Sequence, residues 1–266
     1  MTLKDKILQG RTYLGIELGS TRIKAVLIDD SFSVIASGSK QWENRFENGC
    51  WTYSLDDIHG GIQACYKDLA ENVKAQYGIY PETYGAMGIS AMMHGYMAFD
   101  KNDKLLVPFR TWRNTMTAQA AGELTKLLGF NIPQRWSIAH LYQAVLNKEA
   151  HVPYIAYINT LAGYVHKRLT DRFEVGVGEA SGIFPVEGIG YKKEYCEPTE
   201  KSLAEKGFDH KLKDILPAVR NAGEKGAVLT EEGAKFLDPE GHLKAGVPVC
   251  PPEGDAGTGM VATDSV

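Results

Sequence analysis

The sequence predicts an α/β domain in which helices cover a mixed β-sheet. Two observations lead to this prediction. Residues 12–18 and 22–29 are apolar runs joined by a Gly-Ser-Thr turn, and a third strand is expected over 33–40, so the chain opens as a β-meander. Helix-like and strand-like patterns then alternate, which is typical of sheets flanked by helices. A chain of 266 residues is long enough for one large domain or two modest ones.

The first long helix is expected to begin after Ser54. The Ser54 side chain suits an N-cap, and Asp56 and Asp57 follow in the first turn, where the helix dipole favours acids. Apolar residues recur at helical spacing from Ile58 to Val73. Pro81 closes this region.

The later elements are expected in alternation along the chain. The expected strands cover 84–91, 97–100, 105–112 and 247–250. The expected helices cover 115–128, 139–149, 159–169, 198–206, 209–215 and a last segment that begins at 230–232. Asn114 or Thr115 would cap the helix at 115–128, and Gly129 would end it. Residues 171–196 are Gly-rich and are expected to be irregular.

The composition excludes several classes of partner. The formal net charge is -4 and no basic stripe is interleaved with aromatic residues, so we expect neither a nucleic-acid nor a membrane partner. No run approaches the roughly 20 apolar residues that cross a bilayer. The first ten residues lack the apolar core of a secretory signal. The four cysteines have no C-x-x-C spacing, which argues against a zinc site and favours reduced thiols in the cytoplasm.

The turn at Gly19, Ser20 and Thr21 is the first candidate for chemistry. Backbone N–H groups and two hydroxyls gather there in a concavity that suits phosphate oxygens. The nearby carboxylate of Glu17 would repel phosphate, but it can hold a Mg²⁺ ion that bridges to phosphate. Lys24 is a further cation nearby. The alternative is a plain hairpin whose Glu17 points to solvent.

The second candidate is the stretch PPEGDAGTGM at 251–260. Asp255 stands there in a Gly-rich setting after a short strand, and it could simply cap a following helix. The glycines and Thr258 would also let a phosphate approach a helix N-terminus. Phosphoryl transfer to an alcohol requires one group that accepts the hydroxyl proton and another that holds the metal, so Asp255 and Glu17 together gain significance.

Two further stretches carry polar groups with ordinary structural alternatives. In SAMMHGYM, His94 stands at the end of a buried strand, where a histidine is more often structural than catalytic. In RTWRNT, Trp112 lies between Arg110 and Arg113, a grouping that occurs in sugar sites and also on surface strands.

The order of these motifs resembles the FGGY family of carbohydrate kinases. A Gly-Ser-Thr hairpin is followed by Met-His-Gly near position 90, then by a Trp segment, then by Gly-Asp-Ala-Gly near position 255. GIELGSTRIKAVLID is similar to the first phosphate motif of the family, and MMHG to the Met-His-Gly of its xylulokinase branch. The resemblance spans nearly the whole chain from Tyr13 onward.

The resemblance implies a ribonuclease-H-like fold of the actin and hexokinase type. Residues 1–254 would form the N-terminal, sugar-binding domain, and residues 255–266 would begin a second, ATP-binding domain whose remainder is absent. The implied reaction transfers the γ-phosphate of ATP, with Mg²⁺, to a hydroxyl of a ketose, polyol or sugar acid. Because most ATP contacts belong to the second domain, this chain alone is expected to have negligible kinase activity. The resemblance also allows a homodimer.

The resemblance implies a role for each matching residue. Asp255 would be the general base, would contact the sugar and would assist the metal, while Glu17 would stand where the family usually has a Mg²⁺-linked aspartate. The phosphates would face the hairpin residues Gly19, Ser20, Thr21 and Arg22. The sugar would contact Met93, His94 and Trp112, and Trp136, which falls near a position that touches substrate in some members.

Four positions depart from the family pattern. Glu17 replaces an aspartate, and Glu179 of GEASG stands where xylulokinase-like members also have an aspartate. Asn114 lies near a position that is acidic in xylulokinase, and Ala256 replaces an Asn or Gln. These departures motivate an alternative, a degenerate ATPase-fold regulator or scaffold without a sugar substrate. A third alternative, an unrelated α/β binding module, requires Glu17 and Asp255 to lie far apart. The kinase interpretation instead predicts that these two acids line the same wall of a crevice, with His94 and Trp112 bordering it.

Overall fold

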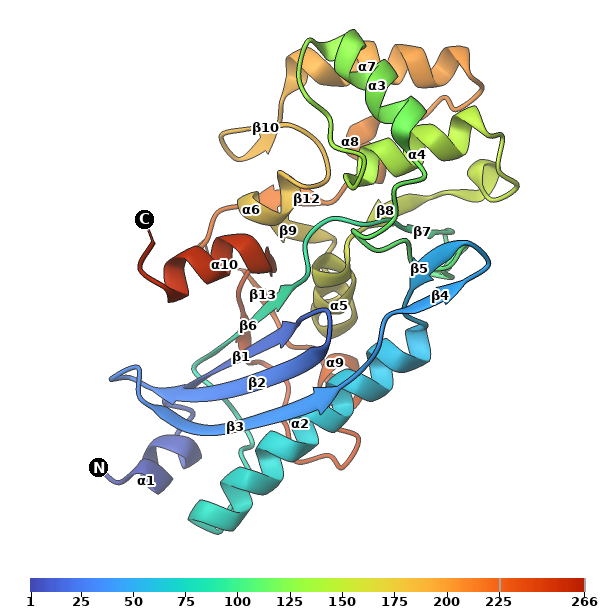
Figure 1. The fold of residues 1–266 in the computed structure, drawn as a ribbon. Helices are drawn as coiled ribbons and strands as arrows, with labels where there is room; N and C mark the ends of the chain where they lie inside the picture. The colour runs from blue at the N-terminus through green and yellow to red at the C-terminus, as the bar shows by residue number, and fades with distance from the viewer. Residues whose placement is uncertain (225, 266) are drawn as a thin grey trace.

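The computed structural model describes residues 1–224 and 226–265, and a mixed sheet dominates it (Figure 1). Within these residues the sheet has seven strands in the order β13-β14-β6-β1-β2-β3, with β15 paired to β6. Strand β1 is antiparallel to β2 and parallel to β6, so the predicted meander and mixed sheet are confirmed. The strands are β1 (Thr12–Leu18), β2 (Arg22–Asp29), β3 (Val34–Gln41), β6 (Ala86–Ala91), β13 (Ala227–Val228), β14 (Pro248–Val249) and β15 (Glu253–Gly254).

Burial alternates along β1 and assigns its two faces. Leu14, Ile16 and Leu18 are buried on one face, whereas Tyr13 and Gly15 are exposed on the other. Because successive side chains in a strand point to opposite faces, Glu17 projects from the face opposite the core. The predicted hairpin therefore presents its acid away from the hydrophobic interior.

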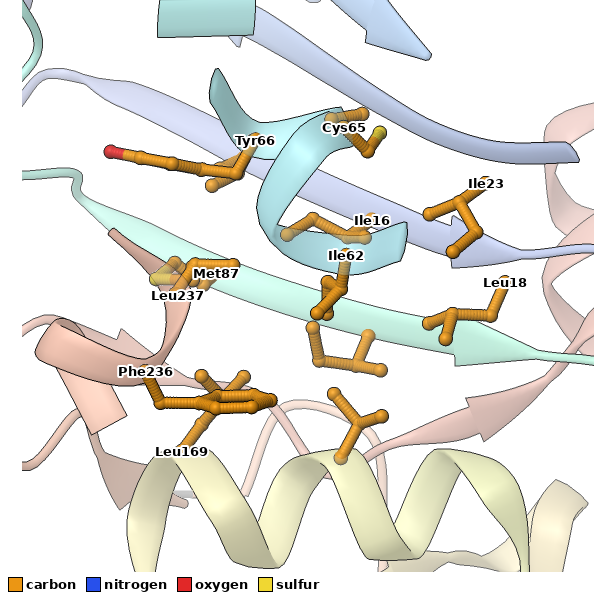
Figure 2. Close-up of a cluster of buried hydrophobic side chains, with 14 of the residues drawn as sticks. Ile16, Leu18, Ile23, Ile62, Cys65, Tyr66, Met87, Leu169, Phe236 and Leu237 are labelled. Atoms are coloured by element: carbon orange, nitrogen blue, oxygen red, sulfur yellow. The ribbon is translucent and has the colours of Figure 1, made fainter. Parts of the chain in front are cut away.

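Helix α2 (Leu55–Tyr77) packs on the core face of the sheet. Ser54 is its N-cap and forms a capping box with Asp57, as the sequence predicts in part, and Gly78 ends it at φ 74°. Helices α5 (Leu161–Thr170) and α9 (Glu231–Leu237) complete the cover of this face. Figure 2 shows the resulting core, in which side chains from β1, β2, β6, α2, α5 and α9 converge.

Gly38 on β3 allows the close approach of α2 to the sheet. A Cβ atom at this position would lie 2.5 Å from the Cys65 carbonyl oxygen and also against the Leu69 amide, and neither backbone group can move freely. We expect Gly38→Ala to lower the free energy of unfolding by about 1–3 kcal/mol or more through overpacking, measured by urea denaturation. Gly60 on α2 has open space around it, so Gly60→Ala should instead stabilise the protein by about 0.5–1 kcal/mol. Equal effects of the two substitutions would contradict this account.

A second hydrophobic cluster lies beside the sheet and is largely helical. Its helices are α3 (Ala118–Leu128), α4 (Ser137–Leu146), η1 (Val152–Tyr154), α7 (Lys193–Glu205) and α8 (Leu212–Ile215). The two-stranded pair β7 (Met97–Phe99) and β8 (Tyr157–Asn159) joins it to the sheet core. Figure 1 shows this helical part at the top of the molecule and the sheet below it.

The remaining elements are short. They are α1 (Leu3–Leu8), β4 (Arg45–Glu47), β5 (Cys50–Thr52), β9 (Glu174–Gly176), α6 (Val177–Ala180), β10 (Val186–Glu187), β11 (Gly190–Tyr191), β12 (Ala218–Arg220) and α10 (Asp255–Ala262). In Figure 1, α10 lies on the opposite side of the sheet from α2. The face that carries Glu17 is thus the face that α10 approaches.

Several predicted elements are wrong in extent or kind. Residues 105–112 form no strand in the described chain, only isolated bridges that join Leu105 to Phe99 and Arg110 to Tyr96; Pro108 has no N–H group for a regular ladder. The helix predicted from 115 begins at Ala118, because Asn114 binds the Trp51 backbone instead of capping.

The segment 171–196 is more regular than predicted, since it contains β9, α6, β10, β11 and the start of α7. Helix α7 also runs through Pro198, which the sequence suggested as a boundary. All four cysteines are free thiols, in line with the expected reduced state. Among residues 1–224 and 226–265, no helix is both long and apolar enough to span a membrane.

Candidate functional site

Glu17 and Asp255 line the same cavity. Its volume is about 550 Å³, and it lies between the open face of β1, β2 and β6 and the start of α10. The prediction that both carboxylates share one crevice is therefore confirmed. The third alternative, an unrelated binding module, required these two residues to lie far apart, and the shared cavity argues against it.

Asp255 is the first residue of α10, and Gly254 rather than Asp255 occupies the N-cap. The Asp255 carboxylate is thus free of a capping role, and its Oδ1 accepts the backbone N–H of Met93 at 3.1 Å. The Ser90 and Thr258 hydroxyls hydrogen-bond at 2.9 Å, which joins α10 to the end of β6. Residues far apart in sequence are thereby brought together at one point.

The Met-His-Gly stretch has a strained backbone. His94 has φ 67°, a left-handed conformation that is uncommon for a residue with a side chain, and Gly95 follows at φ 90°. A Cβ atom at Gly95 would lie 2.7 Å from the Arg110 carbonyl oxygen, and one at Gly182 would lie 2.5 Å from His94 Nδ1. The imidazole is therefore packed tightly between neighbouring segments.

The His94 ring is held in its neutral form. Burial, together with the positive charge of Arg135, lowers the pKa of His94 below its ordinary value, although the nearby Asp255 charge acts in the opposite direction. A neutral imidazole can both donate and accept hydrogen bonds, which suits contact with a sugar hydroxyl.

The turn at Gly19, Ser20 and Thr21 is anchored by aromatic side chains. Trp42 Nε1 donates to the Gly19 carbonyl at 2.7 Å, and the Tyr53 hydroxyl donates to the Ser20 carbonyl at 2.5 Å. Trp112 Nε1 donates to Ser20 Oγ at 3.3 Å. The predicted phosphate turn and the predicted sugar-contacting tryptophan are therefore in contact. Sequence reasoning missed Trp42 and Tyr53, whose spacing from the turn gives no local signal.

Neither His94, Trp112 nor Trp136 is among the residues that line the cavity of Glu17 and Asp255. The prediction that His94 and Trp112 border the cavity is therefore wrong as to its lining. His94 follows Met93, whose N–H donates to Asp255, and Trp112 donates to Ser20 of the hairpin turn. Trp136 precedes α4 and packs near Phe130, with ring centroids 6.2 Å apart. Its neighbour Ser137 hydrogen-bonds to Gly95, so Trp136 is adjacent to the Met-His-Gly stretch.

The hairpin arrangement is compatible with a magnesium ion held by few protein ligands. Glu17 faces Lys24 across the hairpin, at 4.0 Å, and its side chain is 44% exposed. Residues 1–224 and 226–265 contain no group of three or more His, Cys, Asp or Glu side chains that could hold a metal. Mg²⁺ usually takes one or two carboxylates and completes its shell with phosphate oxygens and water, so Glu17 and Asp255 fit. Thr21 and Arg22 are exposed in the same hairpin as Glu17, but neither lines the cavity.

Glu179 is a buried acid close to Asp255. Its side chain is fully buried, and neither carboxyl oxygen has a hydrogen-bond partner of normal geometry among the described residues. Burial raises the pKa of Glu179 to about 8 against the opposing effect of the nearby Thr160 hydroxyl, and the charges of Glu253 and Asp255 add to the rise. The Glu179 carboxyl is therefore mainly protonated at pH 7.

Comparison with known proteins gives a consistent result. The model of the FGGY family of carbohydrate kinases, N-terminal domain, matches residues 12–262. A xylulose kinase of Haemophilus influenzae is 25% identical over 239 residues, which are 85% of this chain and 47% of that protein. A xylulose kinase of Lactococcus lactis is 23% identical over 124 residues, 44% of this chain and 23% of that protein.

Solved structures agree in fold. Ligand-bound xylulose kinase from Lactobacillus acidophilus superposes with a TM-score of 0.74 at 18% identity, covering 96% of this chain and 50% of that one. Plasmodium falciparum glycerol kinase with ADP gives 0.71 at 14% identity, covering 95% and 50%. The predicted α/β fold of this kinase type is confirmed. The chain spans about half the length or less of the curated relatives it matches.

Proposed function

Because this chain belongs to the FGGY family of carbohydrate kinases, we propose that it forms the sugar-binding half of an ATP-dependent sugar kinase. The acceptor is a hydroxyl of a ketose, polyol or sugar acid. The observation that carries the proposal is the hydrogen bond from the Met93 amide to Asp255 Oδ1, because it joins the proposed base to the proposed sugar motif. That Glu17 lines the same cavity supports it further.

In this proposal Asp255 acts on the sugar hydroxyl. The carboxylate accepts the hydroxyl proton while the hydroxyl oxygen attacks the γ-phosphorus, and ADP leaves. The Met93 N–H fixes one carboxylate oxygen, so the other is left to face the substrate. His94, Trp112 and Trp136 would orient the sugar ring.

The phosphates of ATP would lie over the hairpin. They would be bound by the backbone N–H groups of Gly19, Ser20 and Thr21 and by the guanidinium of Arg22. The hydrogen bond from Trp42 to the Gly19 carbonyl stabilises this turn. Mg²⁺, when bound by Glu17 with Asp255 nearby, would neutralise charge on the transferred phosphoryl group. Nucleotide contacts beyond the hairpin would come from a second domain, whose closure would exclude water.

A thermal-shift screen of ketoses, polyols and sugar acids tests the proposal. We expect at least one of them to stabilise the protein, since a ligand at 100 times its Kd adds about 2.7 kcal/mol. Trp112→Ala should reduce that shift, whereas Tyr154→Ala, at an exposed aromatic residue elsewhere, should not. No shift with any of these compounds, in the presence or absence of Mg-ATP, would contradict the proposal.

The second candidate is a regulator or scaffold with a degenerate kinase site. Glu17, Glu179 and Ala256 favour it, because all three depart from the family pattern. It predicts that the protein, tested together with an ATP-binding half, hydrolyses ATP at a rate independent of every sugar in the screen. Sugar-dependent ATP turnover would exclude it.

A further inference from the structure

Glu253 binds the beginning of helix α6 with its carboxylate. Oε2 accepts the backbone N–H of Glu179 at 2.9 Å, and the N–H of Gly178 is near enough to the carboxylate to favour its charged form. Burial raises the pKa of Glu253, while the two N–H donors oppose that rise. The acid lies two residues before Asp255, and no local pattern distinguishes it beyond its place in PPEGD.

Two glycines make room for this carboxylate. A Cβ atom at Gly178 would lie 2.6 Å from Glu253 Oε2, and one at Gly176 would overlap the carboxylate. Neither glycine has a positive φ, so the backbone conformation itself would accept alanine. The space occupied by the Glu253 carboxylate is thus the reason that these positions require glycine.

The backbone on both sides of Glu253 is also fixed. The Pro252 carbonyl accepts the Gly176 N–H at 2.8 Å, and Glu253 and Gly254 pair in parallel with the end of β6. A Cβ atom at Gly254 would lie 2.7 Å from Glu179 Oε2 and would overlap Met93. Residues 252–254 are therefore packed between β6 and α6, and Asp255 is the next residue in the chain.

We propose that Glu253 is a positioning residue, whose carboxylate docks residues 252–254 on α6 and so holds Asp255 against the Met93 amide. The expected effect of Glu253 on catalysis rests on the proposed function, whereas its effect on the position of Asp255 does not. Asp255 is exposed and accepts the Met93 N–H, whereas Glu253 accepts an N–H of α6, so the two acids have separate roles. Glu253 binds the scaffold, and Asp255 faces the cavity.

The Met93 amide resonance in ¹H–¹⁵N spectra tests the position directly. Because this N–H donates to the Asp255 carboxylate, its proton chemical shift should differ from that in Asp255→Ala, which removes the acceptor. In Glu253→Ala we expect less than half of this wild-type difference to remain. Glu253→Gln should recover part of it, because the amide oxygen can still accept one α6 N–H. Glu187→Gln, at an exposed acid, should leave it unchanged.

Two further variants distinguish loss of the Glu253 contact from a general folding defect in Glu253→Ala. Gly178→Ala should also reduce the Met93 shift difference, because its Cβ displaces the carboxylate. Adding Glu253→Ala to Gly178→Ala should cause little further loss, so the two effects should be strongly non-additive. Additive losses, or the full wild-type shift difference in Glu253→Ala, would overturn the proposal.

The catalytic consequence has its own readout. With an ATP-binding half present, Glu253→Ala should lower kcat roughly 10- to 100-fold through misplacement of the base, with KM for ATP unchanged. If the Met93 shift responds to these substitutions as expected but no sugar is phosphorylated by the wild type, the positioning role stands and the proposed function fails. If sugar is phosphorylated but the Met93 shift is insensitive to Glu253→Ala, the proposed function stands and the positioning role fails.

Discussion

Asp255→Asn is expected to lower kcat for sugar phosphorylation by about 10²- to 10⁴-fold, the usual contribution of a positioned general base. Asparagine keeps the shape of the side chain and the oxygen that accepts the Met93 N–H, but it cannot accept the hydroxyl proton. Sugar affinity and the unfolding midpoint should therefore stay close to those of the wild type. The measurement is steady-state kinetics of the protein assayed together with an ATP-binding half.

Asp264→Asn is the matched control for this substitution. Asp264 is exposed just beyond the end of α10 and has φ 51°, a conformation that asparagine also tolerates. It should leave kcat unchanged. An Asp255→Asn variant with wild-type kcat would remove Asp255 from the role of base.

The second large effect is expected at Glu179. We expect Glu179→Gln to raise the free energy of unfolding at pH 8 by up to about 4 kcal/mol, because glutamine removes the cost of keeping a buried carboxyl protonated well above its ordinary pKa. At pH 4.5 or below the two proteins should be nearly equal in stability. The measurement is urea unfolding of both proteins at a series of pH values.

The sign of this effect follows from the direction of the pKa shift. The pKa of Glu179 is raised from 4.5 to about 8 in the folded protein, so between these values the folded state binds more protons than the unfolded state. Stability must then fall as pH rises through this window, by about 1.4 kcal/mol per pH unit at most. Glu179→Gln should lack this slope.

Glu187→Gln, at an exposed acid on β10, is the control and should leave the pH dependence of wild-type stability intact. A wild-type slope in Glu179→Gln would mean that the carboxyl is not buried as a neutral acid. Because this experiment needs no sugar and no ATP, its result is independent of the proposed function.

The sequence predicted correctly those elements that are determined by residues close together in the chain. The hairpin of β1 and β2 and the start of α2 at Ser54 followed from turn chemistry, capping and periodicity. The prediction of a strand at 105–112 was wrong because these apolar residues lie in a loop that forms only isolated β-bridges. Helix α6 was missed because four residues are too few to show a period.

The candidate site depends on contacts between segments distant in sequence. The motif order suggested that Glu17 and Asp255 share a crevice, and the cavity between β1 and α10 contains both. The hydrogen bond between Met93 and Asp255 spans 162 residues, and no local pattern encodes it. The role of Glu253 depends on the space that Gly176 and Gly178 leave for its carboxylate. The neighbouring hydrogen bond from Glu179 to Glu253 spans 74 residues, so no local pattern could reveal this contact.

The central claim is that Asp255, the Met-His-Gly stretch and Trp112 form one sugar site. A crystal structure with the best-stabilising sugar tests it most directly. The account predicts a sugar hydroxyl within about 3 Å of the free Asp255 carboxylate oxygen, with the ring between His94 and Trp112. A sugar bound elsewhere, with no hydroxyl in hydrogen-bond reach of Asp255, would contradict it.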